Sequence, residues 1–469
     1  MHSDMHSDPP EAASRTGGEP IADRRGVLSW MLFDWANQPF HTLILTFIFA
    51  PYFTAQVMAD PVAGQTLWGA TTAVAGAVVA ILSPALGAIA DRTGGRKLWV
   101  LGFSIPYVIG CLGLWYAVPG MDPVWPVLIA FGLAYLGSEV TVLFTNAMLP
   151  HLGPREEIGR ISGSGWAMGY AGGLVSLILV LALLAPAPGS ERTLIGIPPV
   201  LGLDPALGEP ARATGPLSAL WYLIFVIPLF LWTPDSPRSG MRLGAAARAG
   251  LADLVRSIGA LRGERSLASY LLASMIYRDA LAALFIFGGI YAAGVLGWGT
   301  FQLGVFGIVA AATGAMGAWI GGRADRAYGP TPVIRTTILL LILVCLVVLG
   351  TTRTSVLGVA VAPDARLPDL VFFAAGGLLG AAAGSLQAAS RTLLAHQAEG
   401  RMGTGQAFGL YALAGKATAF IGPSAVAIVT AATGSQRLGV APIVALFAIG
   451  LALLSFVKTG SEQPRTTVT

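Results

Sequence analysis

Apolar segments long enough to cross a lipid bilayer recur along the chain from residue 27 to residue 457. At about 1.5 Å per residue, most of them span the roughly 30 Å of a bilayer's hydrocarbon core. Only 11% of the 469 residues are charged, against roughly 25% in a soluble globular protein. The chain is therefore predicted to be a polytopic membrane protein whose partner is the lipid bilayer, which excludes cytosolic enzymes, secreted domains and nucleic-acid binders. Twelve spans are predicted, at residues 27–56, 66–90, 98–118, 123–148, 162–186, 215–233, 267–295, 300–322, 336–352, 370–390, 405–431 and 438–457.

Basic residues in the loops predict the orientation of these spans. With the N-terminus inside, 21 of the 28 Lys and Arg residues fall on the cytoplasmic side, as the positive-inside rule requires. An even number of spans then places both termini in the cytoplasm. Residues 1–26 contain no apolar core followed by a small-residue cleavage site, so no signal peptide is predicted there.

A long polar connection at residues 234–266 divides the spans into two groups of six. Apolar residues recur through it at helical spacing beside several arginines, which predicts an amphipathic helix on the membrane surface. The chain is predicted to consist of five parts. These are a disordered cytoplasmic tail at 1–26, a six-helix half at 27–233, this linker at 234–266, a second six-helix half at 267–457, and a cytoplasmic tail at 458–469.

A short motif occurs once in each half and supports the division. GAIADR at 87–92 and GGRADR at 321–326 share Gly, three residues, then Asp-Arg, and each closes an even-numbered span. Two halves related in this way are typical of secondary transporters. The first copy resembles the loop motif of the major facilitator superfamily, although Gly95 is extra. That resemblance implies an all-α fold of 12 transmembrane helices in two pseudo-symmetric halves. It also implies a gating role for Gly87, Asp91, Arg92, Arg96, Lys97, Gly321, Asp325 and Arg326.

Three longer stretches are similar to the autophagy-related vacuolar amino-acid effluxer family of this superfamily. They begin SWMLFDWANQPFHTL in the first span, LPHLGPREEIGRISG before the fifth, and LQAASRTLLAHQAEG in the tenth. The resemblance implies transport of amino acids. The chain departs from the family in its seventh span, where Tyr277 is followed by Arg278, Asp279 and Ala280 instead of a neutral polar residue, Asp and Gly. The added cation puts an inherited substrate in doubt.

Five ionisable residues lie within the predicted spans, namely Asp34, Glu139, Arg278, Asp279 and Lys416. Each costs about 2.5–3.5 kcal/mol at the bilayer centre on insertion scales, so they are expected to face the bundle interior. An apolar environment disfavours the charged form of a carboxylate, which allows it to load and release protons as access alternates. Asp279 is the first candidate for proton coupling, Glu139 the second and Asp34 the third. The alternative is permanent structural pairing of these acids with Arg278, Arg391 or Lys416.

Polar stripes at helical spacing occur in the first, fourth, seventh and tenth spans. In the superfamily these four spans line the central cavity. Pro39 interrupts the helical hydrogen bonds beside the first stripe. The predicted cavity residues are Asn37, Gln38, His41, Asn146, Tyr277, Arg278, Gln387, Ser390, Arg391 and Lys416. Among them, Arg278 is suited to hold a substrate carboxylate by two parallel hydrogen bonds.

The favoured function is secondary active transport of a small polar organic solute, with amino acids as the first candidates. Transport is predicted to be coupled to protons. Two alternatives stay open: an exporter of amphiphilic compounds or lipids with the same fold, and a non-transporting membrane sensor. No nucleophile–base pair, metal-ligand spacing or nucleotide motif is visible in the sequence, so no enzyme activity, metal or cofactor is predicted. A monomer in a bacterial inner membrane is expected.

Overall fold

The computed structural model describes residues 22–186, 190, 192–261, 263–298 and 300–457. Almost all of the secondary structure is helical. In the first half the α-helices are α1 (Arg24–Pro39), α2 (Phe49–Tyr52), α3 (Pro61–Thr93), α4 (Arg96–Gly113), α5 (Trp125–Met148), α6 (Ile158–Leu183), α7 (Glu209–Arg212) and α8 (Thr214–Trp232). Short 3-10 turns lie at Leu114–Tyr116, Leu149–His151, Arg155–Glu157, Val200–Gly202 and Pro205–Leu207.

The connection between the halves contains α9 (Leu243–Ala260). The second half contains α10 (Arg265–Leu296), α11 (Thr300–Tyr328), α12 (Pro330–Gly350), α13 (Leu367–Ala398), α14 (Thr404–Ala417), α15 (Ile421–Thr433), α16 (Gln436–Gly439) and α17 (Ala441–Leu454). A small antiparallel sheet follows α12, formed in order by β1 (Thr351–Thr352), β2 (Ser355–Val356) and β3 (Val359–Ala360).

Twelve stretches of the described residues are long and apolar enough to cross a membrane. The predicted fold class is therefore confirmed. The predicted sixth and ninth spans, 215–233 and 336–352, correspond to α8 and α12. The ninth begins earlier than predicted, at Pro330, because Pro at the first turn is compatible with a helix and marks its start.

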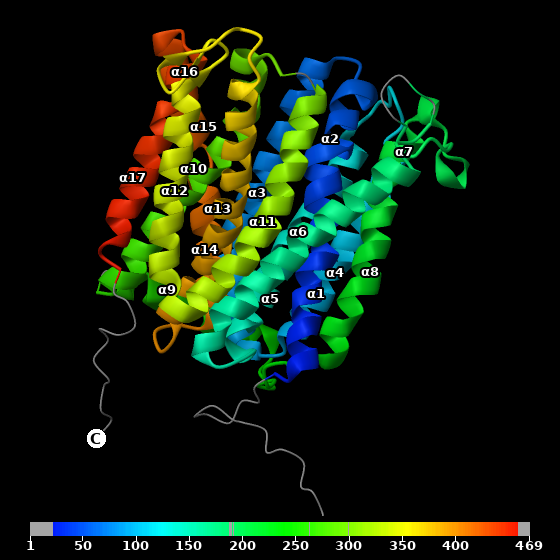
Figure 1. The fold of residues 1–469 in the computed structure, drawn as a ribbon. Helices are drawn as coiled ribbons and strands as arrows, with labels where there is room; N and C mark the ends of the chain where they lie inside the picture. Colours follow the sequence, from blue (N-terminus) through cyan, green and yellow to red (C-terminus); the bar gives the residue numbers. More distant parts are fainter. Residues whose placement is uncertain (1–21, 187–189, 191, 262, 299, 458–469) are drawn as a thin grey trace, which may run out of the picture.

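Each half has its own hydrophobic core. One cluster of buried side chains comes almost wholly from α1 to α8, with Trp30 and Phe131 among its largest members. The other comes almost wholly from α10 to α17 and includes Tyr277 and Tyr291. Figure 1 shows the second half on the left and the first half on the right, with α6 and α11 side by side between them.

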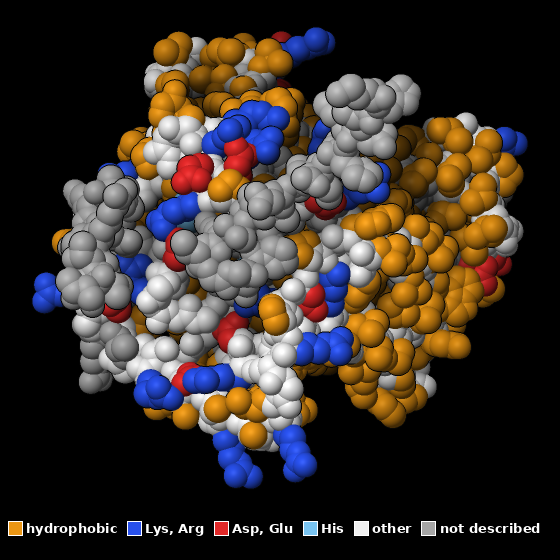
Figure 2. Space-filling model, turned by 90° about the horizontal axis from the view of Figure 1, so that it is seen from below, with side chains coloured by type: hydrophobic (Ala, Val, Ile, Leu, Met, Phe, Trp, Pro, Cys, Tyr) orange, Lys and Arg blue, Asp and Glu red, His pale blue; other side chains and the backbone are white. Residues whose placement is uncertain are grey.

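The start of α1 and the end of α17 lie at the same end of the bundle, the lower end in Figure 1. We call this the terminal end. Seen from this side, Lys and Arg side chains are interleaved with Asp and Glu, while a hydrophobic surface covers the flank at the right (Figure 2). Such a predominantly hydrophobic flank is suited to contact lipid chains.

The first and eleventh spans are interrupted near their middles. In the first span, α1 ends at Pro39 and a π-helix follows at Phe40–Phe47, with another at Phe53–Val57. Proline lacks an N–H and its ring clashes with the preceding turn, so the regular ladder cannot continue. In the eleventh span, α14 and α15 are separated by Thr418, Ala419 and Phe420. Discontinuous helices of this kind commonly form binding sites in transporters.

Candidate functional site

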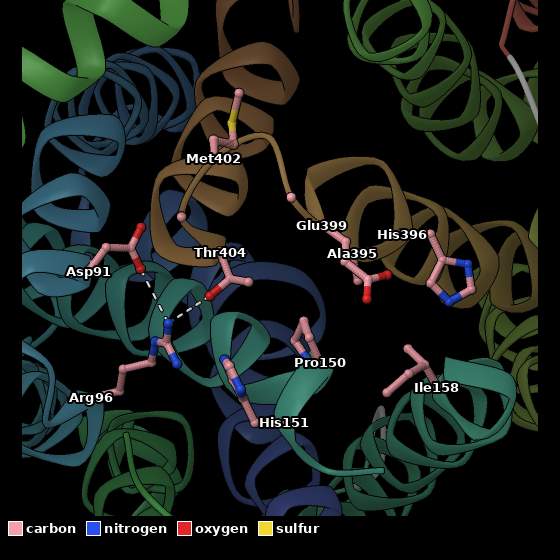
Figure 3. Close-up of a pocket in the computed structure, with 12 residues that line it drawn as sticks. Asp91, Arg96, Pro150, His151, Ile158, Ala395, His396, Glu399, Met402 and Thr404 are labelled. Carbon is pink, nitrogen blue, oxygen red and sulfur yellow. Dashed lines mark hydrogen bonds and ion pairs between the residues drawn. The ribbon is translucent and has the colours of Figure 1, made fainter. Parts of the chain in front are cut away.

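The two halves meet at the terminal end, where α3 crosses the start of α14. The carboxylate of Asp91, near the end of α3, accepts hydrogen bonds from the backbone N–H groups of Gly405 (3.0 Å) and Gln406 (2.8 Å). These groups have no partner within their own helix, and the positive end of the helix dipole attracts the carboxylate. Arg96 completes the contact, because its Nη2 lies 3.2 Å from Asp91 Oδ1 and 2.7 Å from Thr404 Oγ1 (Figure 3).

The second copy of the motif lies where α11 meets the start of α6. Asp325 packs against Gly159, whose missing side chain leaves room for the carboxylate. Arg326 forms an ion pair with Glu157 at 2.6 Å. Unlike Asp91, Asp325 has one oxygen, Oδ2, without a hydrogen-bond partner in the described part of the chain. The two junctions between the halves are therefore similar in position but unequal in bonding.

The remaining motif residues bind within or beside one half. Arg92 forms an ion pair with Asp253 of the linker helix α9. Lys97 donates from Nζ to the carbonyl of Phe230 at 3.0 Å, and Gly321 allows close contact with Ser385. Of the predicted gating residues, the structure thus brings five into contacts between the halves: Gly87, Asp91, Arg96, Asp325 and Arg326. Arg92, Lys97 and Gly321 contact the linker helix or their own half.

A cavity of about 350 Å³ lies at the terminal end between the halves. Its walls come from the end of α3, the loop after α5, the end of α13 and the start of α14, as Figure 3 shows. The lining residues include Asp91, Arg96, His151, His396, Glu399 and Thr404. No group of three or more His, Cys, Asp or Glu side chains suited to a metal ion occurs among the described residues.

Deeper in the bundle, Asp34 of α1 is paired with Arg391 of α13. Arg391 Nη1 lies 3.2 Å from Asp34 Oδ2 and donates to Asn146 Oδ1 at 2.9 Å. Its other nitrogens donate to the side chain and carbonyl of Ser162, at 3.0 and 2.7 Å. The rings of Trp30 and Trp166 also face the guanidinium. Only 5% of the Arg391 side chain is exposed, so this ion pair is buried and almost fully bonded.

Near the middle of the spans lies a second group of charged residues, which we call the central charge cluster: His41, Glu139, Arg278 and Lys416. Lys416 of α14 donates to Glu139 Oε1 of α5 at 2.9 Å, and to the hydroxyl of Tyr135 at 2.6 Å. His41 approaches Ser138 Oγ at 3.3 Å, and the same hydroxyl donates to Asn37 Oδ1 at 3.0 Å. Electrostatic interactions join Glu139 to both His41 and Arg278. Both halves therefore contribute to this cluster.

Arg278 and Asp279 point to different neighbours, as expected for adjacent residues of a helix. The Arg278 guanidinium lies over the ring of Tyr411, 4.2 Å from its centre, and donates to the Tyr411 carbonyl at 3.2 Å. Asp279 is 3% exposed, and its Oδ2 has no hydrogen-bond partner among the described residues. It lies beside Thr418, at the break between α14 and α15.

The other predicted cavity residues are distributed around these groups. The Tyr277 hydroxyl is 2.7 Å from Ser390 Oγ, deep in the second half. Gln38 lies against Gly169 and Gly173 of α6, and Gln387 is half-buried on α13. Neither glutamine joins the central charge cluster. Sequence patterns did not single out Ser138, Ser162 or Tyr411, because a serine or tyrosine within an apolar span gives no signal that distinguishes a ligand from packing.

Comparison with known proteins places the chain in a family. The family model described as "Vacuole effluxer Atg22 like" matches residues 65–465. The uncharacterized MFS-type transporter YxiO of Bacillus subtilis (strain 168) is 24% identical over 444 residues, covering 92% of this chain and 94% of that protein.

Three solved structures of similar fold are distant in sequence. The human organic anion transporter MFSD10 superposes with a TM-score of 0.65 at 15% identity, covering 92% of this chain and 99% of its own. The proton:xylose symporter XylE superposes with a TM-score of 0.65 at 14% identity, covering 92% of this chain and 94% of its own. The transporter FucP in the outward conformation superposes with a TM-score of 0.62 at 15% identity, covering 93% of this chain and 98% of its own. The predicted resemblance is confirmed: the chain is an integral multi-pass membrane transporter of the major facilitator superfamily, not an enzyme, and it belongs to the vacuole effluxer Atg22-like family.

Proposed function

We propose that this transporter couples proton movement to transport of a small polar organic solute, with amino acids as the first candidates. The solute binds at the central charge cluster, and the two halves rock around it. The terminal end faces the cytoplasm of a bacterium, as the distribution of basic residues favours. In this arrangement the bonds by which Asp91 and Arg96 join the halves lie on the cytoplasmic side.

The observation that carries the proton coupling is the environment of Asp279. Asp34 and Glu139 each contact a cation, at 3.2 and 2.9 Å. Asp279 has no such ion pair in the described part of the chain, although it is 3% exposed and lies within a span. A buried carboxylate without an ion pair is costly to keep charged, which makes Asp279 the best candidate among the three acids to exchange a proton. Movement at the adjacent break in the eleventh span would expose the group and release its proton.

The test begins with a thermal-shift screen of amino acids, peptides, sugars and lipids, because a ligand that binds only the folded state raises its apparent stability. The best solute is then used for uptake into proteoliposomes under a pH gradient. We expect Asp279→Asn to abolish gradient-driven uptake and to leave the melting temperature and solute counterflow intact. Asp364→Asn, in an exposed loop, is the matched control and should behave as wild type. Undiminished gradient-driven uptake by Asp279→Asn would refute the proposal.

A further inference from the structure

Arg278 differs from the other two cations in the middle of the bundle. Arg391 and Lys416 are each paired with a carboxylate, at 3.2 and 2.9 Å. Within the described residues, no carboxylate oxygen lies within ion-pairing distance of Arg278, whose partners are the ring and the backbone carbonyl of Tyr411. A guanidinium has five N–H donors in a fixed plane. Most of the donors of Arg278 therefore remain available to a ligand.

The position of this guanidinium depends on a glycine. A Cβ atom at Gly415 would lie 2.5 Å from Arg278 Nη1 and 2.6 Å from Cζ, closer than any side chain permits. The missing side chain leaves room for the guanidinium beside α14, close to both the ring of Tyr411 and Gly415. The arginine is therefore held in place by neutral groups, and among the described residues no carboxylate forms an ion pair with it.

The side chains of the cluster around Arg278 are only partly buried, although they lie in the middle of the spans. The exposed fraction of the side chain is 22% for Glu139 and 23% for Lys416. Arg278 and His41 are half-buried. Glu139 and Lys416 cancel each other's charge, so Arg278 leaves the cluster with one positive charge in excess. An anion that enters this space gains a charge-assisted, two-pronged hydrogen bond with little competing water.

We infer that Arg278 anchors a carboxylate of the transported solute, and that the cluster does not recognise an amino group. Glu139 is the acid that would attract an ammonium, but it is already bonded to Lys416, which Tyr135 also holds. Amino acids and the corresponding acids without the amino group should therefore bind alike, whereas amines without a carboxylate should not bind. This inference rests on the proposed function only in taking the cluster as the solute site.

The experiment measures binding to the purified full-length chain by thermal shift and titration calorimetry. Each amino acid of a panel is compared with its des-amino acid and its decarboxylated amine; leucine, 4-methylpentanoate and 3-methylbutylamine form one such set. Wild type should bind the two acids within a few-fold of each other and should not bind the amine. Arg278→Gln should weaken binding of the acids by about tenfold or more, since a hydrogen bond to a charged group contributes at least that factor.

Arg323 supplies a matched control. It also stacks on an aromatic ring, that of Trp319 at 3.4 Å, but it is exposed at the end of α11. Arg323→Gln should therefore bind the acids as wild type does. If Arg278→Gln does not fold, Arg278→Lys keeps the charge without the planar pair of donors, and its binding of the acids should be several-fold weaker.

Three results would overturn the inference: amines bind as well as acids, no acid in the panel binds at millimolar concentration, or Arg278→Gln and Arg278→Lys bind acids with unchanged affinity. Binding is measured without a pH gradient and does not depend on proton coupling. Acid binding that depends on Arg278, together with failure of gradient-driven uptake, would reject the proposed coupling and retain this inference. Gradient-driven uptake of amines would retain the proposed proton coupling and reject this inference.

Discussion

At the scale of single residues, the bonding of the buried Arg391 differs from that of a partly exposed arginine, Arg353. Its guanidinium bonds to Asp34, Asn146 and Ser162 and is 5% exposed. Arg353 also pairs with an acid, Asp369, at 2.8 Å, but with 33% and 28% of the two side chains exposed. Removing one member of a buried pair leaves an uncompensated charge, whereas an exposed pair contributes little to stability.

We therefore expect Arg391→Gln to destabilise the protein by about 3–5 kcal/mol, and Arg353→Gln by about 1 kcal/mol or less. The double variant Asp34→Asn with Arg391→Gln should recover part of the loss, because it removes both charges. The measurement is thermal unfolding followed by reaction of a thiol-specific dye with Cys111 and Cys345, which are both buried in the folded chain. A double variant less stable than Arg391→Gln would contradict this account.

At the scale of helices, close approach at glycines determines how the halves meet at the terminal end. A Cβ at Gly87 of α3 would lie 2.1 Å from the carbonyl oxygen of Gly405. A Cβ at Gly163 of α6 would lie 2.4 Å from the carbonyl oxygen of Ala318 in α11. Both obstacles are backbone atoms, which cannot rotate away as a flexible side chain can. Small residues at such crossings allow backbones in membranes to pack closely.

Gly87→Ala should therefore open the terminal end. Spin labels on cysteines at Leu98 and Tyr328, exposed residues near the start of α4 and the end of α11, report the separation of the halves. We expect longer distances between the labels in Gly87→Ala than in the background chain. Gly132→Ala is the control, because a Cβ at Gly132 would have no neighbour within 4 Å. Identical distance distributions in the two variants would show that this crossing does not control closure.

At the scale of the whole molecule, ion pairs near the surface also join the halves at the terminal end. Arg155 pairs with Glu399, with 34% and 50% of the side chains exposed, and Glu157 pairs with Arg326. Exposed pairs of this kind contribute about 0–1 kcal/mol each. They are therefore too weak to lock one conformation, but a difference of about 1 kcal/mol changes the ratio of two states roughly fivefold.

Closure should accordingly depend on salt. Raising the ionic strength from about 0.01 to 1 M shortens the Debye length from about 30 to 3 Å. The distances between the same two spin labels report the ratio of molecules with an open terminal end to molecules with a closed one. We expect this ratio to rise by up to roughly fivefold for each ion pair that is screened. Glu399→Gln should reduce this salt response, whereas Glu209→Gln, remote from these pairs in α7, should not. A response unaffected by Glu399→Gln would exclude this pair as its source.

The number of spans, the fold class and the family could be predicted from the sequence. Lipid requires about 20 apolar residues for each crossing, and this requirement applies separately to each segment. The motif beginning at Gly87 and its repeat beginning at Gly321 carried the family resemblance. The irregularity after Pro39 was also predictable, since proline acts on its own turn. The boundaries of the halves and the roles of the site residues remain predictions.

Helical spacing placed Asp34, Glu139, Arg278 and Lys416 in the bundle interior, but it could not assign their partners. Asp34 and Arg391 are 357 residues apart, and Glu139 and Lys416 are 277 apart. Spacing determines which face of a helix carries a residue, whereas contact also depends on the rotation, tilt and depth of the neighbouring helix. The pairing of two acids with cations, and the absence of such a pair at Arg278 among the residues the structure describes, were decided only when the spans packed together.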